Sequence, residues 1–215
     1  MITVVRYVQV QPDQGVSLVP ALQRAMAERT RQAEGCRSGL VLQDIWTPDR
    51  FILLSEWDDA EAFERSRPGW SVRPRYLPVV VSERTHRLRL LHHWEDPSKQ
   101  VTATACILIW APAATADDFQ QFLLHDAEAL LRAQPGLVRR NVYQGEDEAT
   151  RFVDLVGWQS EMALAACYGG VGATLRAGVR RHGGQFEMFA LASTIAQFQR
   201  PTASPEAEPP PAGPV

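Results

Sequence analysis

Side chains that can accept or donate protons stand on otherwise apolar segments in the second half of the sequence. Asp154 alternates with Phe152, Val156 and Trp158, so a strand through these residues places its carboxylate on an apolar face. Burial there can raise the pKa of the carboxylate and make it a general base, or an arginine can pair with it. His182, in the loop-like sequence RRHGG, is the second candidate base.

Hydrogen-bonding groups alternate along two further strand-like segments. Asn141 and Tyr143 fall on one face of LVRRNVYQ, and Tyr7 offers a phenol on the first segment, VVRYVQV. Arg6 falls on the opposite face of that first segment, among valines, where its charge requires an internal carboxylate, solvent or a ligand anion. These four residues are candidates for orienting and stabilising an anionic ligand.

Two tryptophans end the matching segments RFILLSEW and RFVDLVGW. Trp57 and Trp158 each carry a large apolar ring with one N–H group, which suits either the wall of a ligand pocket or a plug in the core. More of the hydrogen-bonding candidates stand in the second half of the chain. We therefore expect the working site in that half.

The composition argues against several classes of function. The chain has 215 residues and a net charge of −3, which gives no general attraction to nucleic acid or anionic lipid. Cys36, Cys106 and Cys167 are far apart and form no pattern of zinc ligands, so we expect reduced thiols in a cytoplasmic protein. The N-terminal segment is too short and too polar to predict export or membrane insertion. Motifs of nucleotide-binding proteins, zinc proteases and hydrolases are lacking. Because the sequence also offers no ligand set for a metal, flavin or haem, we expect no such cofactor.

The positions of these residues follow from an internal repeat. An ungapped offset of 101 positions, the separation of Gly35 from Gly136, superimposes two similar segments of the chain. Self-similarity of this kind indicates duplication of a whole structural unit. The other matched pairs are Arg50 with Arg151, Phe51 with Phe152, Leu54 with Leu155, Trp57 with Trp158, and Ala62 with Ala163.

Each repeat predicts the element order β-α-β-β-α-β, the ferredoxin-like arrangement of an antiparallel sheet with helices on one face. Two such sheets can cover each other, so the sequence predicts an α+β fold in which tandem ferredoxin-like repeats form an intramolecular barrel. A monomer is sufficient for that barrel, although higher assembly is possible. The expected divisions are a first repeat at 1–92, a linker at 93–100, a second repeat at 101–199, and a disordered Pro-rich tail at 200–215.

The helix ending AEGCRSG and the following RFILLSEWDDAEAF make the chain similar to the antibiotic biosynthesis monooxygenase superfamily of dimeric α+β barrels. The resemblance is stronger in the first repeat than in the second, where GWQSEMAL replaces EWDDAEAF. It implies the fold directly. The superfamily includes cofactor-free oxygenases, haem-degrading oxygenases and members without known activity, so the fold alone does not settle the function.

The resemblance implies as first hypothesis a cofactor-independent monooxygenase that acts on a phenolic, polycyclic, polyketide-like molecule and dioxygen. Trp57 and Trp158 would wall the pocket, and Arg6 would stabilise the substrate anion. Either Asp154 or His182 would act as base. Tyr7, Asn141 and Tyr143 would orient the substrate.

Two alternatives remain open. One is a small-molecule-binding or stress-related barrel without turnover. The other is haem degradation, which in the resembling enzymes uses an Asn on the first strand and a His after the Trp. This chain has Arg6 or Ile107 at the first position, and Cys167 or Tyr168 in the second region of the second repeat.

Overall fold

The computed structural model describes residues 1–67 and 79–199, without the side chains of residues 188–197. The predicted tail at 200–215 lies outside the described residues. The described residues form the predicted order β-α-β-β-α-β twice, with four strands in each half, which confirms the fold class. The first half contains β1 (Ile2–Val10), α1 (Gly15–Gln32), β2 (Cys36–Asp44), β3 (Arg50–Trp57), α2 (Ala60–Ser66) and β4 (Val80–Glu95).

The second half follows the same order with a more divided helical layer. Its first helical stretch passes through a π-helical segment, and its second consists of two helices joined at Gly170. The elements are β5 (Ala103–Trp110), the 3-10 turn η2 (Ala113–Thr115), α4 (Ala116–Gln121), the π-helical segment η3 (Phe122–Ala127), α5 (Glu128–Arg132), β6 (Leu137–Gly145), β7 (Arg151–Trp158), α6 (Glu161–Gly169), α7 (Val171–Arg181) and β8 (Gln185–Gln199).

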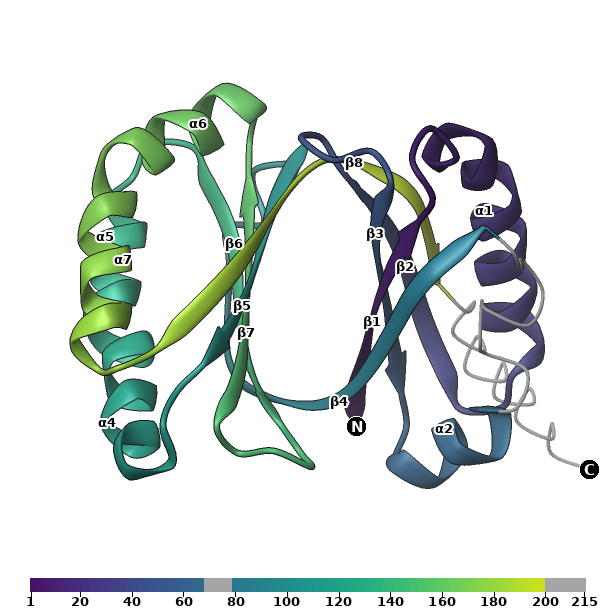
Figure 1. Ribbon diagram of the computed structural model, residues 1–215, viewed down its shortest axis with the longest axis horizontal. Helices are drawn as coiled ribbons and strands as arrows, with labels where there is room; N and C mark the ends of the chain where they lie inside the picture. The colour runs from purple at the N-terminus through teal and green to yellow at the C-terminus, as the bar shows by residue number, and fades with distance from the viewer. Residues whose placement is uncertain (68–78, 200–215) are drawn as a thin grey trace, which may run out of the picture.

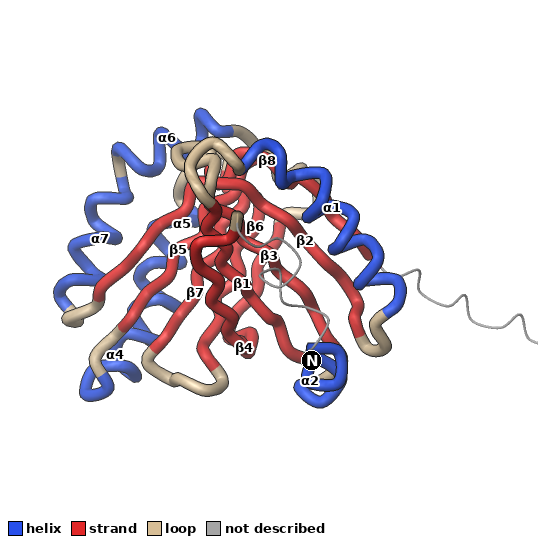
Figure 2. Tube along the Cα trace, turned by 45° about the vertical axis from the view of Figure 1, so that its right-hand side comes forward, coloured by secondary structure: helices blue, strands red, loops and turns tan. Residues whose placement is uncertain are grey.

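The eight strands close into one antiparallel barrel in the order β1-β3-β2-β8-β5-β7-β6-β4. The long strands β4 and β8 join the halves, because β4 pairs with both β1 and β6, and β8 pairs with both β5 and β2. Figure 1 shows α1 and α2 flanking one side of the barrel and α4 to α7 flanking the other. The tube in Figure 2 shows the same arrangement, with strands inside and helices outside.

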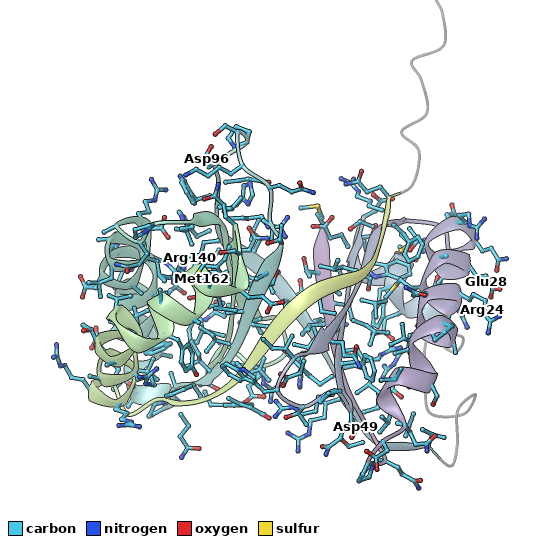
Figure 3. The ribbon with its side chains drawn as sticks, turned by 90° about the horizontal axis from the view of Figure 1, so that it is seen from above. Arg24, Glu28, Asp49, Asp96, Arg140 and Met162 are labelled. Carbon is cyan, nitrogen blue, oxygen red and sulfur yellow. The ribbon has the colours of Figure 1, made fainter. Side chains whose placement is uncertain are left out.

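Alternation along the strands therefore sends side chains to two buried places. One set fills the barrel interior and includes Val5, Leu54, Cys106 and Leu155. The other set faces the helices in each half. Arg24 and Glu28 mark the solvent side of α1, where the side chains point away from the barrel (Figure 3).

The repeated motif holds the second helical segment of each half against the turn before the second strand. Gly35 and Gly136 have φ angles of 77° and 83°, in the left-handed region that glycine adopts without strain. A Cβ atom would lie 2.6 Å from the Ala62 Cβ at Gly35, and 2.7 Å from the Ala163 Cβ at Gly136. The conserved spacing of Gly and Ala within the chain thus specifies a close approach in the fold.

The N-caps of the two helices explain the departure of GWQSEMAL from EWDDAEAF. Asp59 accepts a 2.8 Å hydrogen bond from the Ala62 N–H, and Ser160 accepts a 3.1 Å hydrogen bond from the Ala163 N–H. Aspartate and serine are both good N-cap residues. The motif therefore performs the same structural task in both halves.

Replacing either glycine by alanine is expected to lower the free energy of unfolding by about 1–3 kcal/mol, because the new Cβ is strained and meets the neighbouring alanine. Gly169→Ala is the matched control, since its Cβ would meet nothing within 4 Å. We expect that control to be neutral or slightly stabilising. Urea unfolding of the three variants measures the effect, and equal stability of Gly35→Ala, Gly136→Ala and Gly169→Ala would contradict it.

One boundary and one helix differ from those predicted. β4 continues through Glu95, since residues from His92 to Glu95 pair with β6, so the connection between the halves is shorter than 93–100. Helix α7 was not predicted, although its apolar residues Val171, Leu175 and Val179 recur at helical spacing. Within the described residues, no helix is long and apolar enough to cross a membrane.

Candidate functional site

A cavity of about 70 Å³ lies in the second half, between the sheet and the helices, and we call it the helix-side cavity. Its walls are mostly apolar, with Asp154, Trp158, Tyr168 and Arg176 as polar exceptions. The other lining residues are Ala105, Ile107, Ile109, Phe122, Leu123, Ala127, Leu131, Val156, Leu164, Cys167, Gly172, Leu175, Val179 and Phe186.

Asp154, the predicted base, is buried in this wall and paired with Arg140 from the neighbouring strand β6. The Arg140 Nε lies 3.0 Å from Asp154 Oδ1, and its Nη2 lies 2.7 Å from Oδ2. The arginine pairing considered as an alternative is therefore the observed arrangement. The carboxylate is held rigidly at the cavity wall, with both oxygens engaged.

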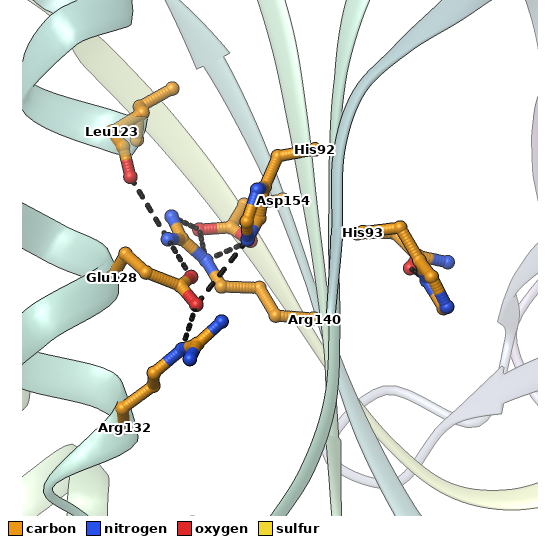
Figure 4. A network of polar contacts seen from close by, with 8 residues as sticks. His92, His93, Leu123, Glu128, Arg132, Arg140 and Asp154 are labelled. Carbon is orange, nitrogen blue, oxygen red and sulfur yellow. Dashed lines mark hydrogen bonds and ion pairs between the residues drawn. The ribbon is translucent and has the colours of Figure 1, made fainter. Parts of the chain in front are cut away.

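Arg140 continues the network to the helices (Figure 4). Its Nη1 donates to Glu128 Oε2 at 2.8 Å and to the Leu123 carbonyl of the π-helical segment at 2.9 Å. Arg132 also donates to Glu128, and the Nε2 of His92 lies 3.3 Å from Glu128 Oε1. Burial works to raise the pKa of Glu128, but hydrogen bonds from Arg140 and Arg132 outweigh it and leave that pKa lowered.

The first half fills the matching space with apolar groups. At the positions of Arg140 and Ala127 it has Gly39 and Met26, and a Cβ added to Gly39 would lie 2.5 Å from the Met26 sulfur. The Met26 thioether therefore occupies the space beside Gly39, and the small Ala127 leaves room for a guanidinium in the second half. Figure 3 shows Arg140 among the elements of that half.

The two tryptophans differ in the partner of their ring N–H group. Trp57 packs edge-on against Phe63 and donates to Ser55 Oγ at 2.9 Å, so it is a satisfied core residue. The residue matching Ser55 is Val156, and the buried Nε1 of Trp158 has no hydrogen-bond partner among the described residues. An unsatisfied buried donor is costly and rare, and a ligand acceptor in the cavity would satisfy it.

Two further polar residues in the cavity wall, Tyr168 and Arg176, were not predicted as site residues. The guanidinium of Arg176 lies 5.0 Å from the centre of the Tyr168 ring, a cation–π distance. Arg176 belongs to α7, so recognising that helix from its apolar spacing would have placed this cation beside the cavity. Burial raises the pKa of the third wall residue, Cys167, to about 11, so it is a neutral thiol near pH 7 and does not suit haem ligation as a thiolate.

Arg6 does not join this site. It lies in the first half on the helix-facing side of β1, where its Nε is 3.0 Å from Glu83 Oε1 and 3.1 Å from Thr85 Oγ1. Burial lowers the pKa of its guanidinium despite the attraction of Glu83. An internal carboxylate is thus the partner of Arg6, as one of the expected possibilities.

His182 follows α7 and packs against Phe119 and Phe122, with its ring centre 5.4 Å from that of Phe122. Because Phe122 lines the helix-side cavity and His182 does not, the histidine stands behind the cavity wall. The structure therefore separates the two candidate bases: Asp154 borders the cavity, while His182 does not.

Asn141 and Tyr143 line a second cavity of about 570 Å³, which we call the barrel cavity. It opens from the barrel interior and shares no lining residue with the helix-side cavity. Asn141 Nδ2 donates to Tyr143 Oη at 3.0 Å, and its Oδ1 lies 2.7 Å from His93 Nδ1. The predicted orienting residues thus face away from Asp154 and Trp158, across the sheet.

Tyr7 also faces the barrel interior, where it lines a third cavity of about 110 Å³, smaller than the barrel cavity. His86, Trp110 and Glu187 line the same cavity. Its ring centre lies 5.8 Å from that of His86. Burial raises the pKa of Tyr7 well above its ordinary value, so the phenol is neutral. The predicted site residues therefore divide among several places instead of converging.

The fold is an α+β barrel closed within one chain, and comparisons with known proteins agree with that class. Residues 1–68 match the family described as antibiotic biosynthesis monooxygenase. This match confirms the resemblance predicted from AEGCRSG and EWDDAEAF. A search of curated proteins found no match.

Solved structures of the same fold include proteins of different description. An anthrone oxidase-like protein is 15% identical over 96% of both chains, with a TM-score of 0.74. A monooxygenase-like protein from Listeria innocua is 11% identical over 88% of this chain and 94% of that one, with a TM-score of 0.53. A major regulator of staphylococcal pathogenesis is 9% identical over 91% of this chain and 100% of that one, with a TM-score of 0.54. At these identities the likeness shows the fold alone.

Proposed function

We propose that the chain is a cofactor-independent monooxygenase that oxidises a phenolic polycyclic compound in the helix-side cavity. The observation that carries this proposal is the buried Trp158 N–H group, which has no partner among the described residues and borders an apolar cavity beside Asp154. An aromatic molecule bearing a carbonyl or phenolate oxygen supplies both the missing acceptor and the apolar surface. The fold of an anthrone oxidase-like protein supports the same substrate class by analogy.

The volume of the cavity sets a condition on binding. Pockets for ligands of this size usually have about 300–1,000 Å³, whereas the helix-side cavity has about 70 Å³. A polycyclic substrate therefore requires α6 and α7 to move away from the sheet. Their junction contains Gly169 and Gly170, both exposed, which suits a hinge.

The reaction we propose needs no external reductant. Asp154 accepts a proton from the activated carbon of the substrate, and the resulting carbanion transfers one electron to dioxygen. Recombination of the two radicals forms a carbon–oxygen bond, and loss of water from the peroxide leaves a carbonyl group. The four electrons that reduce dioxygen to one carbonyl oxygen and one water all come from the oxidised CH₂ group.

Two side chains stabilise the anion in this scheme. The Trp158 N–H group donates to the substrate oxygen, and the Arg176 guanidinium balances the charge that develops there. Arg140 holds Asp154 in place through three hydrogen bonds to the carboxylate. The proposed reaction in the helix-side cavity does not use the other predicted site residues, which are Arg6, Tyr7, Asn141, Tyr143 and His182.

Oxygen uptake in the presence of 1,8-dihydroxyanthrone tests the proposal. We expect chelator-treated protein to consume one dioxygen per quinone formed, faster than a protein-free control. Asp154→Asn should lower the rate by about 100-fold or more, because it removes the proton acceptor, while the matched Leu53→Asn of the first half should retain activity if folded. Uptake no faster than the protein-free control would contradict the proposal.

One observation favours a second candidate, a binding protein without turnover. Both oxygens of Asp154 are already engaged by Arg140, an arrangement that suits a structural ion pair. The same assay separates the two functions. Tight binding of the anthrone without accelerated oxygen uptake would favour the binding protein.

A further inference from the structure

The barrel cavity is a second site with chemistry of its own. It lies where strands of both halves meet, and its lining residues come from β1, β2, β3, β4, β6, β7, β8 and the connection between the halves. Its volume of about 570 Å³ falls in the range of small-molecule sites. The cavity therefore needs no rearrangement to admit a ligand.

A half-buried cation stands in its wall. Arg139 lines the barrel cavity, and its Nε atom is buried without a hydrogen-bond partner. No ion pair joins Arg139 to any carboxylate in the described part of the chain. Burial of this N–H group of a cation without an acceptor is unfavourable, and a bound anion would compensate it.

The other charged side chains of the cavity already have partners among the described residues. Glu56 accepts a 2.7 Å hydrogen bond from Ser38 Oγ, and Lys99 is paired with Asp96 at 2.9 Å. The Oε2 atom of Glu95 lies 3.9 Å from His93 Nε2. Within the described part of the chain, Arg139 is thus the cationic side chain of this cavity that is left for a ligand.

A hydroxyl group stands in the same wall. Tyr143 Oη accepts a hydrogen bond from Asn141 Nδ2, so its own O–H remains available as a donor to Thr3 or to a ligand. Burial raises the pKa of Tyr143 to about 12, which keeps that proton on the phenol near neutral pH. The cavity thus offers a guanidinium and a phenolic donor together.

Apolar side chains complete the cavity. Leu54 and Leu155, which are matched residues of the two halves, both belong to the barrel core and line the cavity, together with Leu40 and Val101. These residues suit the hydrocarbon part of a ligand. Polar and apolar walls in one cavity favour an amphipathic molecule.

We propose that the barrel cavity binds a small organic carboxylate with an apolar body, such as a medium-chain fatty acid. The carboxylate pairs with Arg139 and accepts from Tyr143, while the hydrocarbon lies against Leu54 and Leu155. This site is independent of the proposed oxidation, because the two cavities have no lining residue in common.

Calorimetric titration with octanoate and with neutral octan-1-ol tests the proposal on the full chain. We expect one octanoate to bind per chain. The alcohol should bind more weakly by about tenfold or more, since it lacks the charge. Arg139→Gln should weaken octanoate binding by about tenfold or more and leave the affinity for the alcohol unchanged. Tyr143→Phe should weaken octanoate several-fold.

Two control variants define the site. Arg65→Gln removes the same charge from the exposed surface of α2 and should leave octanoate binding unchanged. Trp158→Phe, in the helix-side cavity, should also have no effect. Equal affinity for acid and alcohol in the wild-type protein, no octanoate binding, or equal weakening by Arg139→Gln and Arg65→Gln would overturn the proposal. The wild-type comparison decides it even if Arg139→Gln fails to fold.

Discussion

The first half expressed alone, as residues 1–95, is expected to be insoluble or to associate, while the full chain is a stable monomer in dilute solution. Without the second half, β2 loses its partner β8 and β4 loses its partner β6, so two strand edges are exposed. The inner face of the sheet, with Val5, Leu54 and Leu88, loses its cover as well. Two copies can restore both sets of contacts by forming an intermolecular barrel.

Light scattering after size-exclusion chromatography measures this effect. The matched second-half fragment, residues 96–199, should behave in the same way, because it exposes β6 and β8. Mixing the two fragments should yield a soluble pair. A soluble monomer of either fragment at micromolar concentration would contradict the intramolecular barrel.

Arg140→Met is expected to lower the free energy of unfolding by about 3–5 kcal/mol, because it leaves Asp154 and Glu128 buried without their shared cation. Arg132→Met is the matched control, since Arg132 bonds the same Glu128 from a half-exposed position. We expect that control to cost about 1 kcal/mol or less. Chemical unfolding at neutral pH compares the two.

The first half supplies a rescue for Arg140→Met. At the positions of Ala127, Glu128, Arg140 and Asp154 it has the uncharged residues Met26, Ala27, Gly39 and Leu53. Introducing all of them should recover most of the lost stability, since apolar replacements of buried ion networks are often neutral or stabilising. The rescued protein should not bind 1,8-dihydroxyanthrone, because methionine at the Ala127 position fills the helix-side cavity. The variant is Ala127→Met, Glu128→Ala, Arg140→Gly and Asp154→Leu.

The sign of the pH dependence follows from the same network. Because the folded-state pKa of Glu128 is lowered, its contribution to stability is present above its ordinary pKa of 4.5 and is lost as the pH falls. Arg140→Met should therefore lose less stability on acidification than the wild-type protein. Equal stability of Arg140→Met and Arg132→Met would contradict the structural role of the network.

The fold was predictable because the repeat marks positions with strict geometric demands. Gly35 and Gly136 need a left-handed backbone and close contact with an alanine, and both requirements survive the divergence of the two halves. Strand alternation likewise identified correctly which residues share a face, as for Asp154 and Trp158. These signals are local, so a single sequence reveals them.

The division of site residues among cavities was not predictable from alternation. Strands of this barrel are buried on both sides, so the pattern does not say which face meets the helices and which meets the barrel interior. Asn141 and Tyr143 consequently lie across the sheet from Asp154. The Arg140 partner of Asp154 comes from the neighbouring strand, and its identity depends on strand register.

The most direct test of the central claim is the affinity of 1,8-dihydroxyanthraquinone, the product expected from the anthrone, for Trp158→Phe and Trp57→Phe. Both variants should lose about 1–2 kcal/mol of stability, because each removes part of a buried indole. Only Trp158→Phe should weaken binding, by about fivefold or more, since Trp158 alone of the two offers an N–H group without an internal acceptor in the described structure. Equal weakening in both variants, or unchanged affinity in Trp158→Phe, would contradict the assignment of the working site to the helix-side cavity.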